Sequence, residues 1–107
     1  MDLHDIPYLS IAQLGELIKS KEISSLEATE AYLERISQID GVLNSYITVT
    51  YDEARQSAKQ ADKSIADGHY HGPLHGIPVA VKDQFFTKGV RTTAGSNLLW
   101  EFIPEED

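Results

Sequence analysis

The chain has 107 residues, of which 41% are hydrophobic, and it carries a formal net charge of −8 with no cysteine. This length gives room for one domain and not two. The negative charge repels phosphate backbones and excludes direct nucleic acid contact by this segment, and the lack of cysteine excludes disulfides and thiolate metal sites. No apolar stretch reaches the roughly 20 residues that span a bilayer, and no secretion signal opens the chain. We therefore expect a cytoplasmic protein with no membrane contact.

Two amphipathic helices are predicted at the start of the chain. Ser10 with Gln13 three residues later resembles a capping box and begins the first helix. Ser24 with Glu27 begins the second in the same way, and Gly41 is placed to end it in a left-handed turn. We expect these two helices to pair as an amphipathic hairpin.

Two strands and a third helix are predicted after the hairpin. Residues 45–50 are rich in β-branched and aromatic side chains, and residues 77–82 begin with an apolar run bounded by glycine and proline. Between these strands, Thr50 with Glu53 begins a helix that ends at Gly68. The small-residue stripe on this helix would allow close packing on a sheet, and it consists of Ala54, Ala58, Ala61 and Ile65.

The order helix, helix, strand, helix, loop, strand predicts an α/β architecture. It would comprise an amino-terminal helical hairpin plus the first strands and helix of a mixed sheet covered by helices, left incomplete within these residues. Unpaired strand edges and uncovered apolar faces favour association. We therefore expect the chain by itself to be marginally stable or to associate with itself.

Lys82 is the principal candidate for chemistry, because it ends the apolar run of residues 77–81, where a charged side chain is costly. A lysine of ordinary pKa is neutral in about one molecule in 2,500 at pH 7, so a lysine base needs a pKa lowered by roughly 3 units. Burial without an acidic partner can lower a pKa by that much. Alternation along a strand would place Asp83 on the opposite face, away from the Lys82 amine. The same pattern also fits a lysine that reaches water over a buried stem.

The run GPLHGIPVAVKD (residues 72–83), with TKGVRTTAGS (residues 87–96) close behind it, resembles the opening of the amidase signature family. The resemblance extends back through the helical leader and so covers essentially the whole chain. It implies that residues 1–107 are the amino-terminal part of one amidase domain, truncated before the catalytic serines. Gln84 is a departure, because members of the family usually carry asparagine after the Lys-Asp pair.

The resemblance implies a serine amide hydrolase with a Ser-Ser-Lys triad and no cofactor, in which Lys82 is the catalytic lysine. The bridging and nucleophilic serines of the family have no counterpart in these residues, so the chain alone is expected to be inactive. Implied partners are a small-molecule amide and the remainder of the amidase domain, with a homo-oligomer or amidotransferase subunits as further possibilities.

Two functional hypotheses from different classes stay open. The first is an amide-hydrolysing enzyme, within which a general amidase and the glutamine-hydrolysing subunit of a tRNA-dependent amidotransferase are not separated by these residues. The second is a noncatalytic protein whose hairpin and exposed edges bind a partner.

Other polar groups have structural explanations. Ser96 lacks the Gly-x-Ser-x-Gly elbow of a nucleophile and is interpreted as a turn or cap hydroxyl. His69, His71 and His75 lie close in sequence, but no carboxylate or cysteine stands at ligand spacing beside them, so no metal site is predicted.

Overall fold

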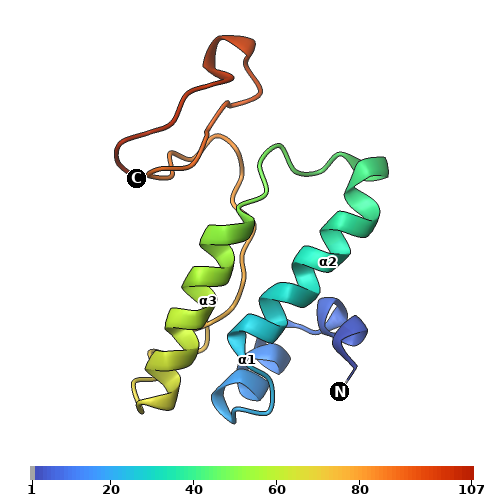
Figure 1. Ribbon diagram of the computed structural model, residues 1–107, viewed down its shortest axis with the longest axis vertical. Coiled ribbons are helices and arrows are strands. Elements are labelled where there is room, and N and C mark those ends of the chain that lie inside the picture. The colour runs from blue at the N-terminus through green and yellow to red at the C-terminus, as the bar shows by residue number, and fades with distance from the viewer. Residues whose placement is uncertain (1) are drawn as a thin grey trace. The chain divides into compact units, whose positions relative to one another are not determined.

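The computed structural model describes residues 2–107 (Figure 1). The chain divides into two compact units. Met1, the first residue of the domain predicted above, lies outside the described residues. Residues 2–45 together with Tyr51–Pro78 form one unit, which we name the helical unit. Tyr46–Thr50 together with Val79–Asp107 form the second, which we name the carboxyl-terminal unit.

The helical unit contains every α-helix of the described chain, and all three predicted helices are confirmed. A 3₁₀ helix that was not predicted, η1 (Leu3–Tyr8), comes first. It is followed by α1 (Ile11–Lys19), α2 (Ser25–Leu43) and α3 (Tyr51–Ala66) (Figure 1). Within residues 2–107, no helix combines the length and the apolarity that crossing a bilayer requires.

The predicted caps begin α1 and α2. The Ser10 side chain accepts from the Gln13 amide at 3.1 Å, and the Ser10 amide donates to the Gln13 side chain at 2.9 Å, which completes the capping box. The Ser24 hydroxyl accepts from the Glu27 amide at 2.9 Å. Each bond satisfies an amide that a helix start leaves unpaired.

The predicted end of α2 at Gly41 is wrong, because the helix continues to Leu43. Asn44 is the left-handed residue, with φ 54°, and its amide donates to the Asp40 carbonyl at 2.7 Å. Asparagine tolerates this conformation better than most residues, so it can end a helix where glycine is not used.

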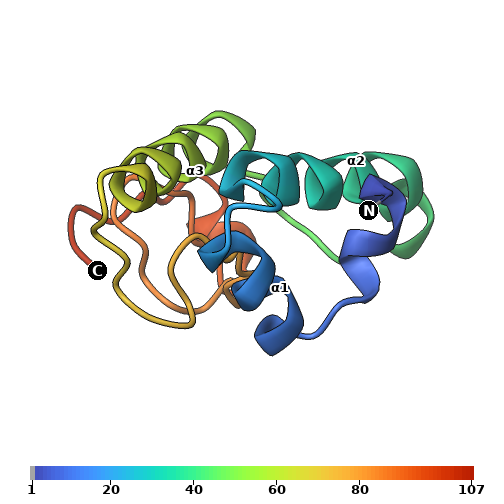
Figure 2. The same cartoon turned by 90° about the horizontal axis from the view of Figure 1, so that it is seen from below.

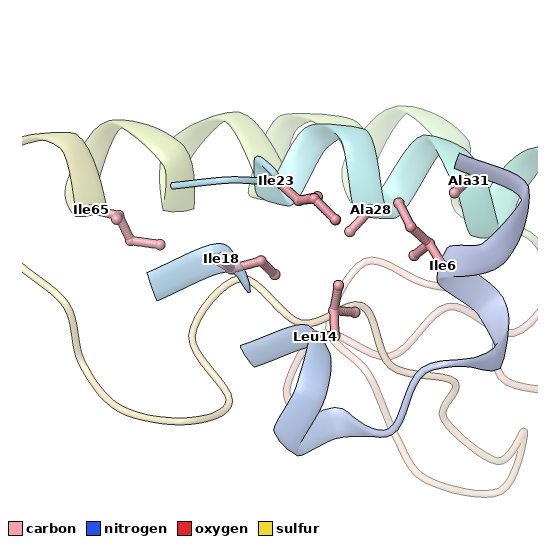
Figure 3. Packing of buried hydrophobic residues seen from close by; sticks show 7 residues of the cluster. All are labelled: Ile6, Leu14, Ile18, Ile23, Ala28, Ala31 and Ile65. Carbon is pink, nitrogen blue, oxygen red and sulfur yellow. The ribbon is translucent and has the colours of Figure 1, made fainter. Parts of the chain in front are cut away.

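The three helices and η1 enclose a common apolar core. Helix α2 packs mainly against α3 and η1, so the predicted hairpin of the first two helices is not the principal pairing. Helix α1 lies to one side of α2 and α3 and adds its apolar face to theirs (Figure 2). The core residues are Ile6, Leu14, Ile18, Ile23, Ala28, Ala31 and Ile65 (Figure 3).

A polar junction joins the start of α2 to α3 and to the following loop. The amides of Ser25 and Leu26 donate to the two carboxylate oxygens of Asp62 on α3, at 2.6 and 3.0 Å. The Ser25 hydroxyl donates to the Gly76 carbonyl at 2.6 Å. A carboxylate is favourable at a helix amino terminus, because the unpaired amides and the helix dipole both attract negative charge. Asp62 therefore helps to fix the position of α3 on α2.

The two predicted strands are wrong: residues 45–50 and 77–82 form no strand and have irregular backbone, with one bend at Ile47. Across residues 2–107 the structure has no strand, and its one β-bridge is an isolated pairing of Thr87 with Val90. A strand forms only where a neighbouring strand accepts its backbone hydrogen bonds, and neither segment has such a neighbour here. The mixed sheet is therefore absent from the described chain, and its architecture is helical.

Arg91 holds together distant parts of the carboxyl-terminal unit. Its guanidinium donates to the Thr48 hydroxyl at 3.2 Å and to the Ile47 carbonyl at 3.1 Å, and it lies 4.4 Å from the centre of the Trp100 ring. The unit contains one short 3₁₀ helix, η2 (Asn97–Leu99). Its buried residues are Thr92, Thr93 and Pro104. Hydrogen bonds and a cation–π contact, rather than an apolar core, therefore hold this unit.

Candidate active site around Lys82

The motif GPLHGIPVAVKD begins in the helical unit, where a close contact and a positive φ favour glycine at position 76. The φ of Gly76 is +81°, and a Cβ added there would lie 3.1 Å from the Ser25 Cβ and 3.3 Å from the Ile18 Cγ2. These distances are shorter than ordinary van der Waals contact, and the positive φ also disfavours side chains. The glycine in the motif therefore has a structural reason: it lets the chain pass close to the start of α2.

The motif ends in the carboxyl-terminal unit, where Lys82 begins a turn. The amide of Phe85 donates to the Lys82 carbonyl at 3.1 Å, so the turn closes with Gln84 in the place of the usual asparagine. The side chain of Lys82 is exposed. The predicted burial of this lysine is therefore not found within residues 2–107. Burying an amine requires apolar groups around it, and neighbouring Val79 and Val81 are themselves exposed.

The carboxylate next to Lys82 is held by the TTAGS segment. One oxygen of Asp83 accepts from the Thr93 amide at 2.9 Å, and the other accepts from the Thr93 hydroxyl. The Ala94 amide also donates to the Asp83 carbonyl at 2.7 Å. Hydrogen bonds from the Thr93 side chain and then its amide lower the pKa of Asp83, and the positive charge of Arg91 lowers it further. Asp83 is therefore held as a carboxylate that accepts from Thr93.

The partnership of Asp83 with Thr93 is not among the predictions from the sequence. There, Asp83 is only a possible partner of Lys82, and Thr93 is only part of a motif. The two residues are ten positions apart, beyond the reach of turn and helix patterns, and only the fold of this unit brings them together. The short-range signal that remains in the sequence is the Thr-Thr pair before Ala94 and Gly95. In the structure, the positive φ values of Ala94 and Gly95, 50° and 71°, mark a tight turn there.

Two weaker candidates have ordinary structural roles. Ser96 precedes η2, where its hydroxyl accepts from the Leu98 amide at 3.2 Å, which confirms the interpretation as a cap. The His75 ring accepts from the His71 amide at 3.0 Å and stacks on Tyr70. Among the residues that the structure describes, no three His, Cys, Asp or Glu side chains meet as metal ligands.

Comparison with known protein families identifies the family of the chain. The model of the family described as Amidase matches residues 27–107, well over half of the sequence. The chain belongs to the Amidase family. The match begins in α2 and includes both motifs around Lys82, so membership agrees with the resemblance drawn from the sequence.

Several curated relatives of the chain share one name, which is that of the A subunit of glutamyl-tRNA(Gln) amidotransferase. The protein from Geobacter metallireducens (strain ATCC 53774 / DSM 7210 / GS-15) is 50% identical over 107 residues, which is 100% of this chain and 21% of the relative. The protein from Geobacter sp. (strain M21) is 50% identical over 99 residues, 92% of this chain and 20% of the relative. The protein from Cutibacterium acnes (strain DSM 16379 / KPA171202) is 45% identical over 105 residues, 98% of this chain and 21% of the relative.

The chain spans about a fifth of the length of these relatives. No solved structure matches it significantly. The matched region is therefore one part of what the relatives contain.

Proposed function

We propose that residues 1–107 form the amino-terminal part of an amide-hydrolysing enzyme and that Lys82 is the base of its Ser-Ser-Lys triad. The observation that carries the proposal is the position of Lys82 at the end of GPLHGIPVAVKD, inside a segment that belongs to the Amidase family. The catalytic serines would lie outside these residues.

The proposed mechanism is a proton relay. A neutral Lys82 accepts a proton from the bridging serine while that serine takes the proton of the nucleophilic serine, whose oxygen attacks the amide carbonyl. The departing nitrogen then receives the proton back along the same path. Backbone amides of a Gly/Ser-rich segment outside these residues would stabilise the oxyanion.

The relay needs Lys82 to be largely neutral, and this requires cover that the described residues do not supply. Several large apolar side chains of the carboxyl-terminal unit are exposed, and the remainder of the amidase domain is the cover that we propose for them. They are Val79, Val81, Phe85, Phe86, Leu98, Leu99, Trp100 and Ile103. Packing on this surface would remove water from the end of the motif and disfavour the charged form of the amine.

We further propose that the amide is that of glutamine and that the enzyme works with amidotransferase subunits. The three relatives described above, at 45–50% identity, are all named as the A subunit of an amidotransferase, and this favours the amidotransferase over a general amidase. A cytoplasmic location is part of the same proposal.

The test is Lys82→Ala in the full-length enzyme that carries this segment, with ammonia release from glutamine as the measurement. Loss of a general base lowers turnover by about 10²- to 10⁴-fold, and circular dichroism should stay unchanged because Lys82 is not part of the apolar core of the helical unit. Lys88→Ala is the matched control, since Lys88 is also exposed and only its backbone amide is engaged, by Asp107. Turnover at the wild-type rate in Lys82→Ala would refute the role.

A noncatalytic partner-binding protein is the second candidate, and the exposed apolar side chains favour it as well. The DNA that follows the codon for Asp107 separates the two. A reading frame that continues into a Gly/Ser-rich segment supports the enzyme, whereas a native stop codon with a stable monomeric product supports the partner-binding protein.

A further inference from the structure

Asp83 is the charged group closest to Lys82 in the sequence, and its carboxylate is already engaged. Both of its oxygens accept hydrogen bonds from Thr93, one from the amide at 2.9 Å and one from the hydroxyl. Thr93 is completely buried, and its hydroxyl oxygen accepts in turn from the Gly95 amide at 3.1 Å. Three hydrogen bonds, two to Asp83 and one from Gly95, therefore fix the amide and the hydroxyl of Thr93 beside the carboxylate.

The engagement of Asp83 matters because a free carboxylate beside an amine favours the ammonium form. An opposite charge within about 4–6 Å raises the pKa of a lysine, which opposes the neutral state that a base requires. Alternation along a strand was the expected reason for the separation of the two side chains, but the segment is not a strand. Hydrogen bonding by Thr93 is the restraint that the structure provides in its place.

The other charges near this site also keep the Asp83 carboxylate from pairing with the Lys82 amine. The positive charge of Arg91 favours the ionised form of the Asp83 carboxyl, and the Arg91 guanidinium donates hydrogen bonds to Thr48 and Ile47. Among residues 2–107, the Lys82 amine has no carboxylate within ion-pair distance, and the one ion pair there joins Arg55 to Glu30 in the helical unit. The carboxylate and the amine are adjacent in the chain, yet the carboxylate is bound elsewhere.

We propose that Thr93 is a positioning residue, which holds the Asp83 carboxylate so that it does not pair with the Lys82 amine and thereby keeps that amine available as a neutral base. The inference rests on the proposed function of Lys82. It adds a role for the TTAGS segment, because its buried threonine sets the charge state of the neighbouring lysine. The bond from the Ala94 amide to the Asp83 carbonyl, at 2.7 Å, holds the backbone of the same turn.

The first experiment is the pH dependence of kcat/KM in the full-length enzyme. Thr93→Val removes the hydroxyl donor but keeps the shape, so the freed oxygen of Asp83 can pair with Lys82. The acid limb of the profile should move up by about 1 pH unit, since a close carboxylate raises a lysine pKa by about 1–3 units. Thr93→Ser restores the hydroxyl and should restore the limb. An unchanged limb in Thr93→Val, with normal circular dichroism, would overturn the inference.

Thr87→Val is the matched control for these variants. The Thr87 hydroxyl donates to the Phe85 carbonyl at 3.3 Å in the same unit and makes no bond to Asp83. Its profile should coincide with that of the wild type. A shift equal to that of Thr93→Val would indicate a general effect of losing a hydroxyl and would overturn the inference.

The second experiment titrates Lys82 directly by competitive acetylation and mass spectrometry, which needs no turnover. The Lys82 pKa should rise in Thr93→Val and fall back in the double variant Asp83→Asn with Thr93→Val, because the amide carries no charge. Asp83→Asn alone should change it by less than the rise in Thr93→Val. Equal pKa values in the single Thr93→Val and the double variant would overturn the inference.

The two proposals fail in different ways. If Lys82→Ala keeps the wild-type rate, the proposed function fails. If Lys82→Ala is inactive while Thr93→Val leaves both the profile and the titration unchanged, only the role of Thr93 fails.

Discussion

The two units of this chain are stabilised by different interactions. The helical unit buries apolar side chains from η1 and all three α-helices, with Ile6, Leu14 and Ile18 almost completely enclosed. The carboxyl-terminal unit buries two threonines and a proline and leaves most of its large apolar side chains exposed. The first has a core of its own, whereas the second depends on directional hydrogen bonds around Arg91 and Asp83.

This difference shows that the residues closest to the proposed chemistry lie in the less buried unit. A region with few buried apolar contacts opens at lower free energy than a packed core. Lys82, Asp83 and Thr93 belong to such a region in this chain. Their final arrangement therefore depends more strongly on what packs against them than the arrangement of α1, α2 and α3 does.

The largest difference in the free energy of unfolding is expected between leucine-to-alanine substitutions in the two units. Leu14→Ala removes a side chain that is 2% exposed and should lower the free energy of unfolding by about 2–5 kcal/mol. Leu98→Ala removes one that is 96% exposed and should change it by about 0.5 kcal/mol or less. Urea unfolding followed by circular dichroism measures both. Equal losses would contradict the division into a packed and an uncovered unit.

A second prediction concerns the junction of α2 and α3. Asp62→Asn weakens the acceptors for the amides of Ser25 and Leu26 and should cost about 1–3 kcal/mol, because the bonds are charge-assisted and partly buried. Asp67→Asn, at an exposed position after α3, is the control and should stay within about 0.5 kcal/mol. If both variants unfold at the same urea concentration, the junction does not stabilise the helical unit.

A third prediction separates crowding from backbone strain at two glycines. Gly76 and Gly68 have similar φ values, +81° and +86°, but a Cβ at Gly76 would meet Ser25 and Ile18 whereas a Cβ at Gly68 would meet nothing within 4 Å. Gly68→Ala should cost about 1 kcal/mol for the left-handed conformation. Gly76→Ala should cost about 1 kcal/mol more, because crowding adds to strain. Thermal unfolding measures the difference, and a cost no greater than that of Gly68→Ala would show that the contact with Ser25 relaxes freely.

The smallest predicted effect is the titration of Asp83. Hydrogen bonds from Thr93 lower its pKa in the folded chain below the ordinary value of 3.8. They therefore stabilise the fold above that value, and the contribution is lost as the pH falls through the lower, folded pKa. Thr93→Val should raise the pKa of Asp83, as measured by NMR of the carboxyl carbon, and Thr87→Val should not. An unchanged Asp83 pKa in Thr93→Val would mean that the hydroxyl bond contributes nothing.

Local signals in the sequence predicted the helices well. The capping residues Ser10 and Ser24 and the glycine after α3 act within a few positions, so they begin or end helices whatever the rest of the chain does. The end of α2 was misplaced by a few residues, because Asn44 rather than Gly41 adopts the left-handed conformation. The family was also accessible from sequence, since GPLHGIPVAVKD and TTAGS carry it.

The strands and the surroundings of Lys82 could not be predicted in the same way. Composition favoured strands at residues 45–50 and 77–82, but a strand requires a partner to accept its hydrogen bonds, and burial of an amine requires neighbours on several sides. Both conditions depend on distant residues. The role of Lys82 as a base also depends on distant residues, so it stays a prediction.

By itself, the sequence determined where the helices begin, which family the chain belongs to and which lysine is the candidate base, because each of these depends on short runs of residues. Tertiary structure alone decided that α2 packs on α3 and η1, that Asp62 binds the start of α2, and that Thr93 rather than Lys82 holds Asp83. These contacts join residues ten or more positions apart. They exist only once the chain has folded, because no local preference encodes which distant donor a carboxylate will meet.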